Sequence, residues 1–361
     1  MNITFLIGSL KGGGAERVTC NLANYLAEKG HNVTILTIHE PEDRSHLNLS
    51  VDYQTLTRKR IPLTFIRALF KIACLGKYIL LNKPDVYVPF LPQSCKCLFL
   101  YKRIIKCPII ITERSSPESL PIKAQQNRIS FAQKADGAVW QTSSVSDWYN
   151  QHVKYPTCII PNAINVEFLI EPNRHVRAKR IVAIGRLTKL KGFDLLIDAF
   201  ALVANQLDEY TLEIYGEGNC RDELSRQIKS KGLSNRIKLL GFCDDIPRAI
   251  RDASLYISSS DYEGMPNSLM EAMALGLPCI ATDCPSGGSR LLIQDGKNGL
   301  LVPVRKVENM AEAILKVLDD SQLAESLSQE AILVRDVLSA DKIYGKWEKY
   351  ICDVVEKYKR L

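Results

Sequence analysis

Two glutamates with seven residues between them, Glu263 and Glu271, enclose a predicted turn and the start of a helix. A carboxylate pair suits two kinds of chemistry, the acid and base catalysis of a hydrolysis or the binding of substrate hydroxyl groups. Gly264 permits close approach of a ligand to the backbone, and Pro266 fits the first turn of a helix that ends at Gly276. Because helix-start amides attract anions, this segment predicts a ligand site at the end of a strand.

The same residues have a purely structural interpretation. Ser268 and Glu271 stand in the Ser-x-x-Glu spacing of a capping box, in which Glu271 serves only to cap its own helix. Glu263 is then a solvated loop acid. Both interpretations stay open at this point.

Two cations stand in a second loop, Gly185–Gly192, between a predicted strand and a predicted helix. Arg186 and Lys191 can both reach a diphosphate bound at that turn, where the helix start contributes backbone N–H groups. The alternative is a pair of solvated loop cations. Together with the two glutamates, the cations favour a ligand that carries both phosphate and sugar hydroxyl groups.

Three consecutive glycines, Gly12, Gly13 and Gly14, follow the first predicted strand. They are a further candidate phosphate contact, because glycines let backbone amides approach an anion closely. The spacing Gly12-x-Gly14-x-x-Arg17 lacks the third glycine of a dinucleotide-binding fingerprint, which disfavours an oxidoreductase. The chain also lacks a GxxxxGK[ST] motif, which argues against a P-loop NTPase. A flexible connection between strand and helix is the alternative.

The elements that must position these residues alternate strand and helix twice over. In the first half we expect a helix over 15–29 and strands at 3–7, 33–38, 86–89, 109–112 and 138–140. In the second half we expect helices over 193–204 and 221–231 and strands at 181–184, 212–215, 237–240, 255–258, 278–282 and 300–302. This pattern predicts an α/β protein with two Rossmann-like domains that face each other across a cleft.

The domain boundaries follow from a segment at 158–172 that is typical of a linker. We expect an N-terminal domain at 1–170 and a C-terminal domain at 171–340. The last residues are amphipathic, with one apolar stripe formed by Ile343, Trp347, Ile351, Val354 and Tyr358. We expect a helix at 341–361 that packs back on the N-terminal domain.

The composition is typical of a soluble globular protein, with 46% hydrophobic and 24% charged residues among 361. No run of eighteen uncharged apolar residues predicts a membrane span, and the start lacks the features of a secretory signal. Eleven scattered cysteines without a neighbouring histidine cluster are typical of reduced thiols. We therefore expect a cytoplasmic protein without a metal site.

The net charge of +7 is unevenly distributed. Residues 1–170 carry 20 Lys and Arg against 12 Asp and Glu, whereas residues 171–361 carry 27 against 28. Within 58–106 eleven basic residues stand against one acid, Asp85. A basic amphipathic helix at 61–81 would bind an anionic membrane surface. A core-facing helix with a solvated basic face is the alternative, and the absence of a nucleic-acid-binding motif disfavours DNA or RNA.

Six motifs in this order carry a resemblance to a known family. They are Gly12-Gly13-Gly14-Ala15-Glu16-Arg17, Gly185-Arg186 with Lys191-Gly192, Gly216-Glu217-Gly218, Leu240-Gly241-Phe242, Glu263 with Glu271, and Asn298-Gly299-Leu300-Leu301-Val302. Over essentially the whole chain they resemble family 4 of the retaining glycosyltransferases, which have the GT-B fold. The stretch Ile111–Pro117 looks like that of bacterial enzymes that add N-acetylhexosamines to lipid-linked oligosaccharides.

The resemblance implies three catalytic residues. Arg186 and Lys191 would neutralise the diphosphate of a sugar nucleotide, which is the leaving group, and Glu263 would bind hydroxyls of the donor sugar. Glu271 would bind the ribose. The base would lie against Phe242 and Cys243. The other implied substrate contacts are Gly13, Gly14, Gly216, Gly264, Met265, Pro266, Asn267 and Ser268. No metal or other cofactor is expected, because the two cations neutralise the phosphates and no Asp-x-Asp triad is present.

The chain departs from the family pattern at one place. Many relatives carry a histidine beside the donor sugar after the strand that ends near residue 112, whereas this chain has Glu113 and Arg114 there. Its five histidines stand elsewhere, at positions 31, 39, 46, 152 and 175. Either Glu113 or Arg114 contacts the sugar or the acceptor, or the two form a salt-bridged loop pair.

The resemblance therefore implies a glycosyltransferase on the cytoplasmic face of the membrane. It would move a sugar with retention, an N-acetylhexosamine such as GalNAc by preference, from a UDP-sugar to a polyprenyl-diphosphate-linked saccharide of surface polysaccharide or O-antigen. Its partners would be the nucleotide sugar, the lipid-linked acceptor and an anionic membrane surface, and no nucleic acid. The alternatives are a UDP-sugar epimerase on the same fold and a non-catalytic module that binds sugar nucleotides.

Overall fold

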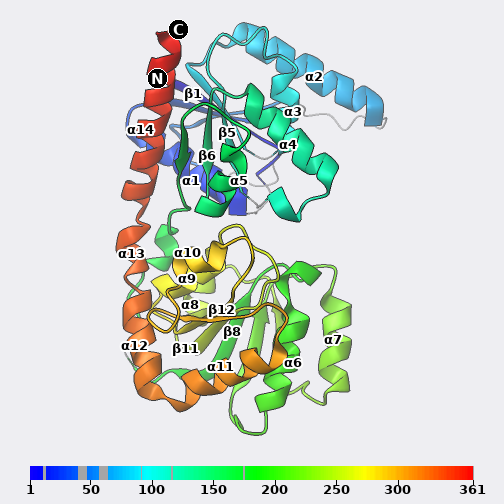
Figure 1. Ribbon diagram of the computed structural model, residues 1–361, viewed down its shortest axis with the longest axis vertical. Coiled ribbons are helices and arrows are strands. Elements are labelled where there is room, and N and C mark those ends of the chain that lie inside the picture. The colour runs from blue at the N-terminus through cyan, green and yellow to red at the C-terminus, as the bar shows by residue number, and fades with distance from the viewer. Residues whose placement is uncertain are drawn as a thin grey trace. The chain divides into compact units, whose positions relative to one another are not determined.

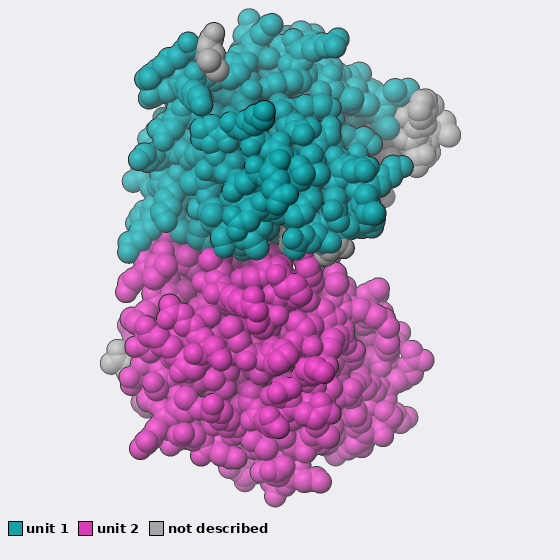
Figure 2. Space-filling view, viewed as in Figure 1, with its two compact units in different colours: residues 1–163, 341–361 teal, residues 164–340 magenta. Residues whose placement is uncertain are grey.

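The computed structural model describes residues 1–10, 14–39, 47–56, 64–90, 92–114, 117–173 and 175–360. The chain forms two compact units (Figures 1 and 2). The first contains residues 1–163 together with 341–361, and the second contains residues 164–340. The division thus falls at 163/164, seven residues before the boundary expected from the sequence, and the C-terminal segment belongs to the first unit.

The first unit is built on parallel strands. Four of them, β1 (Asn2–Ile7), β2 (Asn32–Thr37), β3 (Asp52–Thr55) and β4 (Val86–Pro89), form a sheet in the order β3-β2-β1-β4. Three more, β5 (Ile110–Glu113), β6 (Gly137–Trp140) and β7 (Thr157–Ile159), pair in chain order. Two parallel bridges, Tyr87 with Ile109 and Phe90 with Thr112, join β4 to β5. The predicted linker at 158–172 was wrong at its start, because Cys158 and Ile159 belong to β7.

Helices cover the strands of the first unit (Figure 1). They are α1 (Gly14–Glu28), α2 (Thr64–Leu81), α3 (Pro92–Phe99), α4 (Ile122–Lys134), α5 (Ser143–Asn150) and α14 (Ala340–Lys359), with a 3₁₀ turn η1 (Pro117–Ser119). The apolar stripe of α14 is buried in the unit except at Tyr358, which is half-buried. Trp347 stacks on Phe90, and the Tyr350 hydroxyl accepts the Ala138 N–H and donates to the Pro156 carbonyl. No helix within the described residues is both long and apolar enough to cross a bilayer.

The second unit contains one sheet of six parallel strands. They are β8 (Ala178–Ile184), β9 (Thr211–Tyr215), β10 (Ile237–Gly241), β11 (Ala253–Ser258), β12 (Cys279–Thr282) and β13 (Leu300–Val302), and their order is β10-β9-β8-β11-β12-β13. This is the strand order of a doubly wound dinucleotide-type sheet. All six strands are parallel, but the order in which they are added reverses at β8: β9 and β10 lie on one side of it, and β11, β12 and β13 lie on the other. The loops after β8 and β11 therefore diverge at that point.

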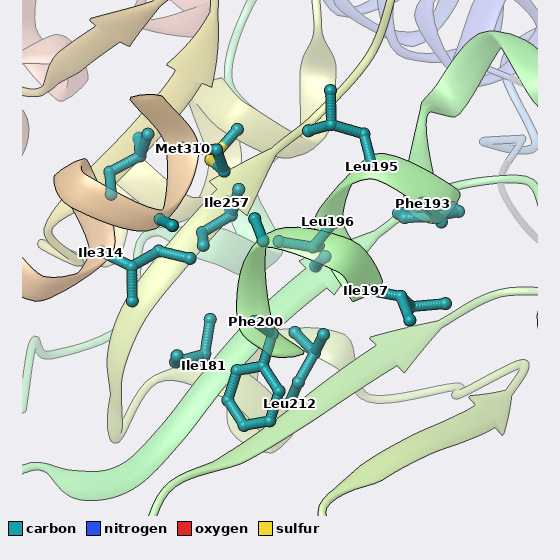
Figure 3. Packing of buried hydrophobic residues seen from close by; sticks show 14 of the residues in the cluster. Ile181, Phe193, Leu195, Leu196, Ile197, Phe200, Leu212, Ile257, Met310 and Ile314 are labelled. Carbon is teal, nitrogen blue, oxygen red and sulfur yellow. The ribbon is translucent and has the colours of Figure 1, made fainter. Parts of the chain in front are cut away.

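Helices on both faces fix the strands of the second unit. They are α6 (Phe193–Val203), α7 (Arg221–Ser230), α8 (Ile246–Ile250), α9 (Asn267–Ala274), α10 (Gly288–Leu292), α11 (Val307–Asp319), α12 (Ser321–Ala331) and α13 (Val334–Val337), with 3₁₀ turns η2 (Val166–Phe168) and η3 (Lys189–Lys191). Helices α6 and α11 pack together, and α9 packs with α12. Figure 3 shows the core, in which Leu196 and Phe200 of α6 lie among side chains of the strands and of α11. Because α6 starts directly after η3, this packing anchors the loop that carries Arg186 and Lys191.

Candidate functional site

The two loops with candidate chemistry follow neighbouring strands at the point where the strand order reverses. Strand β8 pairs in parallel with β11, with Val182 opposite Tyr256. The loop 185–192 follows β8, and the segment 259–266 follows β11. In doubly wound sheets, ligands bind outside the carboxyl ends of the strands at this position. The strand order therefore places the predicted cations and the first glutamate at one site.

Lys191 and Glu263 are in direct contact within the second unit. The Lys191 ammonium forms an ion pair with the Glu263 carboxylate. The same carboxylate accepts a hydrogen bond from the Ser260 hydroxyl at 3.2 Å, and the Ser259 hydroxyl donates to the Lys191 carbonyl at 2.9 Å. About a quarter of the Lys191 side chain and a sixth of the Glu263 side chain stay exposed (25% and 17%). Both charged groups thus remain accessible to a ligand.

Arg186 is an exposed cation at the same strand end. It forms no ion pair within the part of the chain that the structure describes. The loop around it is ordered by its own backbone, because the Thr188 N–H donates to the Arg186 carbonyl at 2.7 Å and the Lys191 N–H donates to the Thr188 carbonyl at 3.0 Å. A charged side chain without a partner beside a paired one is suited to bind an anionic group.

The loop 185–192 needs its last glycine. Gly192 adopts a φ of +60°, in the left-handed region that favours glycine. A Cβ atom at this position would lie 2.1 Å from the Ser259 carbonyl oxygen. Gly192 therefore lets the loop after β8 lie directly against the segment after β11, which brings Lys191 to Glu263.

The capping-box interpretation of Ser268 and Glu271 is wrong. Helix α9 begins at Asn267, and its N-cap is Pro266, which makes no side-chain capping bond. Ser268 lies inside the first turn, where its hydroxyl accepts from the Tyr256 hydroxyl at 2.9 Å and donates to the Ile184 carbonyl at 3.4 Å. The serine thus ties α9 to the ends of β11 and β8. Burial raises the pKa of the Tyr256 hydroxyl well above its usual range, so it stays protonated.

Glu271 is a buried carboxylate in α9, with 5% of its surface exposed. The helix ends as the sequence predicts, with Gly276 in the left-handed region at φ +71°. The Gly276 N–H donates to the Met273 carbonyl at 2.9 Å, and the Leu277 N–H donates to the Ala272 carbonyl at 3.1 Å. This is a Schellman motif, and it fixes the length and direction of α9.

A segment that sequence reasoning missed holds the turn at Glu263 and Gly264. The Ser286 hydroxyl, buried after β12, donates to the Glu263 carbonyl. Gly288, at the start of α10, packs so closely that a Cβ atom there would lie 1.9 Å from the Gly264 carbonyl oxygen. The run Ser286-Gly287-Gly288 was the available signal, since a serine and two glycines after a strand permit such a close approach. Beyond the turn, Met265 is buried.

The remaining candidates of the second unit lie at the same edge of the sheet. The Gly216 N–H donates to the Gly241 carbonyl at 2.7 Å, so Gly216 joins the ends of β9 and β10. Phe242 follows β10 with 81% of its surface exposed, and Cys243 is half-buried. An exposed phenylalanine at a strand end provides an aromatic face for a base, two strands away from Arg186.

In the first unit, Glu113 is engaged by the protein itself. Its carboxylate is 6% exposed, forms an ion pair with Arg128 and accepts the Tyr149 hydroxyl at 3.1 Å. It also accepts the Arg114 backbone N–H at 3.0 Å. The alternative of a salt bridge between the Glu113 and Arg114 side chains is therefore wrong, because the partner of Glu113 is Arg128.

Arg114 has no carboxylate partner in the described part of the first unit. Its Nη1 donates to the Asn162 side-chain oxygen at 2.6 Å, and its guanidinium carbon lies 4.9 Å from the centre of the Phe90 ring and 5.8 Å from that of Trp347. Its Nε and Nη2 are buried without a hydrogen-bond partner. Burial lowers the pKa of Arg114 to about 10, which still leaves it charged near neutral pH. Gly14 is the first residue of α1, and Gly13 lies outside the described residues.

No cluster of three or more His, Cys, Asp or Glu side chains within the described ranges is placed to hold a metal ion. All eleven cysteines are free thiols. Burial raises the pKa of Cys95 and of Cys107 to about 12.

Two family models match the chain and together span residues 12–334. Residues 12–168 match the model described as Glycosyltransferase Family 4, and residues 167–334 match the model described as Glycosyl transferases group 1. The boundary between the two matches lies close to the division between the structural units.

Curated relatives match over nearly the full length. One, from Campylobacter jejuni, is GalNAc-alpha-(1->4)-GalNAc-alpha-(1->3)-diNAcBac-PP-undecaprenol alpha-1,4-N-acetyl-D-galactosaminyltransferase, which is 28% identical over 98% of this chain and 99% of its own. Another is the lipopolysaccharide core biosynthesis glycosyltransferase LpsE of Rhizobium meliloti, which is 26% identical over 88% of this chain and 89% of its own. Their names specify an undecaprenol-linked saccharide for the first and the lipopolysaccharide core for the second.

Solved structures share the fold. Anabaena HepE in complex with UDP superposes with a TM-score of 0.82 at 20% identity, covering 98% of this chain and 100% of that one. Sucrose-phosphate synthase from Thermosynechococcus elongatus superposes with a TM-score of 0.84 at 19% identity, covering 99% and 100%. With both family models, the relatives and this fold in agreement, the chain belongs to family 4 of the glycosyltransferases and has the GT-B fold.

Proposed function

We propose that this glycosyltransferase transfers a sugar from a UDP-sugar to a polyprenyl-diphosphate-linked saccharide, with retention of configuration and without a metal ion. The observation that carries the proposal is the contact between Lys191 and Glu263, together with the exposed cation Arg186 on the same loop as Lys191. A sugar nucleotide needs groups of both kinds, cations for its diphosphate and a hydrogen-bond acceptor for the hydroxyls of its sugar.

In this proposal the two cations stabilise the leaving group. When the bond between the sugar and the diphosphate breaks, negative charge develops on the departing phosphate oxygen. Arg186 has no partner to give up within the described chain, and Lys191 can contact a phosphate while it stays near Glu263. Fixed charges at the developing anion lower the barrier without reorganisation, so no metal is required in this scheme. A second oxygen of the departing phosphate accepts the proton of the acceptor hydroxyl that attacks the sugar.

The two glutamates bind hydroxyl groups in different surroundings. Glu263 is partly exposed and oriented by Ser260 and Lys191, which suits the donor sugar. Glu271 is buried in α9 and suits the ribose, which is the same in every UDP-sugar. Discrimination between sugars therefore rests on Glu263 and its neighbours rather than on Glu271.

The names of relatives support the choice of donor and acceptor. Two Campylobacter jejuni relatives, 28% identical each, are N-acetylgalactosaminyltransferases whose names specify undecaprenol-linked acceptors. We take from them an N-acetylhexosamine, by preference GalNAc, as the donor sugar and a lipid diphosphate saccharide as the acceptor. In the first unit, Arg114 is a better candidate for a substrate contact than Glu113. The Glu113 carboxylate is paired with Arg128, whereas two nitrogens of Arg114 have no hydrogen-bond partner among the described residues.

A lipid-linked acceptor requires the enzyme to work at a membrane surface, and the first unit has a suitable face. Helix α2 buries Leu75, Tyr78 and Ile79 in the unit and exposes Leu69, Phe70, Leu80 and Leu81. Lys77 lies exposed on the same helix. Exposed apolar side chains next to basic ones suit the headgroup region of an anionic bilayer. The sequence left open whether this helix faces the core or binds a membrane. In this proposal one side of α2 packs in the core and the other contacts the membrane.

Liposome sedimentation tests this membrane contact. The variant Leu80→Asp/Leu81→Asp is compared with Leu202→Asp, which changes an exposed leucine of α6 in the second unit. We expect wild type and Leu202→Asp to sediment with vesicles that contain anionic lipid and the double variant to stay in the supernatant. Equal sedimentation of all three would contradict the role of α2.

The reaction is tested with a panel of UDP- and GDP-sugars and a polyprenyl-diphosphate-linked saccharide, with products read by mass spectrometry. We expect a product heavier than the acceptor by one N-acetylhexosamine, formed only from a UDP-sugar. Conversion of a UDP-sugar into its epimer without acceptor would favour an epimerase. Binding of UDP without any turnover would favour a non-catalytic module.

A further inference from the structure

Arg305 has an unusual backbone conformation. It is the one non-glycine residue with a positive φ, +58°, among those the structure describes. A residue with a long side chain adopts this region at a cost in free energy, and keeps it where the surrounding structure requires it. Arg305 lies in the loop between β13 and α11, outside the segments that carry the candidate catalytic residues.

The guanidinium group of Arg305 joins three segments. Its Nη1 donates to the Asp194 carboxylate at 2.6 Å, in the first turn of α6. Its Nη2 donates to the Lys189 carbonyl at 3.3 Å and also to the Asp261 carboxylate. The pKa of Arg305 is raised, first by its hydrogen bond to Asp261, so the group stays charged.

The partners of Arg305 flank the candidate catalytic residues. Lys189 and Asp194 lie on either side of Lys191, and Asp261 lies two residues before Glu263. The Asp261 N–H already donates to the Leu190 carbonyl at 2.9 Å, so the two loops touch through their backbones. Arg305 adds a charged cross-link from a third loop. The second Asp261 oxygen, Oδ1, is buried without a hydrogen-bond partner, which leaves Arg305 as the cation that compensates this carboxylate.

We infer that Arg305 is a positioning residue that holds Lys191 and Glu263 in register for the sugar nucleotide. This inference rests on the proposed function for its substrate. Both Nη atoms of Arg305 are occupied by protein acceptors, so its effect reaches the ligand through the two loops. In this left-handed conformation the Arg305 side chain reaches Asp194, Lys189 and Asp261 together.

The variant Arg305→Gly separates this role from a structural one. Glycine adopts the left-handed conformation without strain, so the change removes the guanidinium and the backbone cost together. We expect a melting temperature within a few degrees of wild type and a loss of kcat/KM for the UDP-sugar of about tenfold to a hundredfold, since small displacements of reacting groups cost this much. Arg305→Lys keeps a cation and should recover part of the loss. Arg226→Ala, in which an exposed arginine of α7 is removed, is the matched control.

Hydrogen exchange measures the positioning directly. In Arg305→Gly, amides of residues 189–192 and 261 should exchange faster than in wild type and in Arg226→Ala. In a double-mutant cycle, Asp261→Asn should add little to the loss caused by Arg305→Gly, because both changes remove the same cross-link. Unchanged exchange together with a kcat/KM within twofold of wild type would overturn the inference. Faster exchange in a protein that binds no UDP-sugar would uphold Arg305 as a cross-link and refute the proposed function instead.

Discussion

Lys191 and Glu263 form an ion pair although they lie 72 positions apart along the chain. One follows β8 and the other follows β11, and these strands are neighbours only because the sheet reverses its order there. The topology of the sheet thus brings a cation, which we propose binds phosphate, into contact with a carboxylate, which we propose binds sugar hydroxyls. Arg186, on the same loop as Lys191, adds a second cation that has no partner within the described residues.

Removing either member of this pair should impair turnover more than stability. Lys191→Ala and Glu263→Ala should each lower kcat by about 10²–10³-fold, as is typical for the loss of one group that stabilises the transition state. Because the Lys191 and Glu263 side chains are only 25% and 17% exposed, each single variant should also lower the free energy of unfolding, by about 1–3 kcal/mol for the partner left unpaired. Steady-state kinetics of the single and double variants provide the check. Losses that add fully in the double variant would show that the two residues act independently.

Gly192→Ala should destabilise the second unit. The new Cβ would overlap the Ser259 carbonyl, and the left-handed φ of +60° adds strain. Backbone strain of this kind costs about 1–3 kcal/mol, and the overlap adds to it. Gly232→Ala is the matched control, because Gly232 has a φ of +70° but open space around its Cβ position. Urea unfolding should rank Gly192→Ala below Gly232→Ala, and equal stabilities would contradict the close contact between the two loops.

Ser268→Ala should cost stability through Tyr256. The substitution leaves the buried Tyr256 hydroxyl without its partner, which costs about 1–3 kcal/mol. Tyr256→Phe should cost less, since Ser268 keeps the Ile184 carbonyl. The double variant should be more stable than the sum of the single losses implies, because no buried hydroxyl is left unpaired. Additive losses in a double-mutant cycle would argue against this hydrogen bond.

Glu113→Ala should destabilise the first unit rather than change substrate affinity. It leaves Arg128, whose side chain is 14% exposed, without its counter-ion, and such a change costs about 3–5 kcal/mol. Tyr149→Phe removes one hydrogen bond to the same carboxylate and should cost about 1 kcal/mol. Thermal unfolding and the KM for the UDP-sugar are measured together. A normal melting temperature with a raised KM would instead assign Glu113 to the substrate.

The buried thiol of Cys95 should make stability depend on pH in the alkaline range. Burial raises the pKa of Cys95 from about 9 to about 12, so the unfolded chain releases this proton at lower pH than the folded chain does. The contribution is therefore fully present below pH 9 and is lost as the pH rises towards 12. Urea midpoints between pH 8 and 11 should fall less steeply in Cys95→Ala than in wild type. Parallel curves would contradict the burial of this thiol.

Much of the fold follows from apolar runs in the sequence. The strands at Val86–Pro89 and Leu300–Val302 match their predicted bounds, because each is a short apolar run next to residues that interrupt strands, Pro84 and Asp85 before the first and Gly299 and Pro303 around the second. Strand β3 was not predicted, since its sequence, Asp52-Tyr53-Gln54-Thr55, lies at a sheet edge and has no apolar run. Strand β7 was not predicted either, because the residues after it, Pro161 and Asn162, are typical of a linker.

The candidate site was predictable where chemistry and strand ends coincide. Arg186 and Lys191 lie in the loop after β8 and Glu263 lies in the segment after β11, so their residue types and positions indicated one site. The interactions that hold them were not predictable, because Ser286 and Arg305 come from loops whose contacts depend on tertiary packing. The capping-box pattern at Ser268 misled because α9 begins one residue earlier, which puts the serine inside the helix.

Binding of UDP measured by isothermal titration calorimetry tests the central claim most directly. Wild type and the control Arg226→Ala should bind UDP with the same Kd. Arg186→Ala should bind about tenfold to a hundredfold more weakly, because a hydrogen bond to a charged group contributes about 1.5–3 kcal/mol. Equal affinity in wild type and Arg186→Ala, or no binding of UDP to wild type, would contradict the placement of the sugar-nucleotide diphosphate at the end of β8.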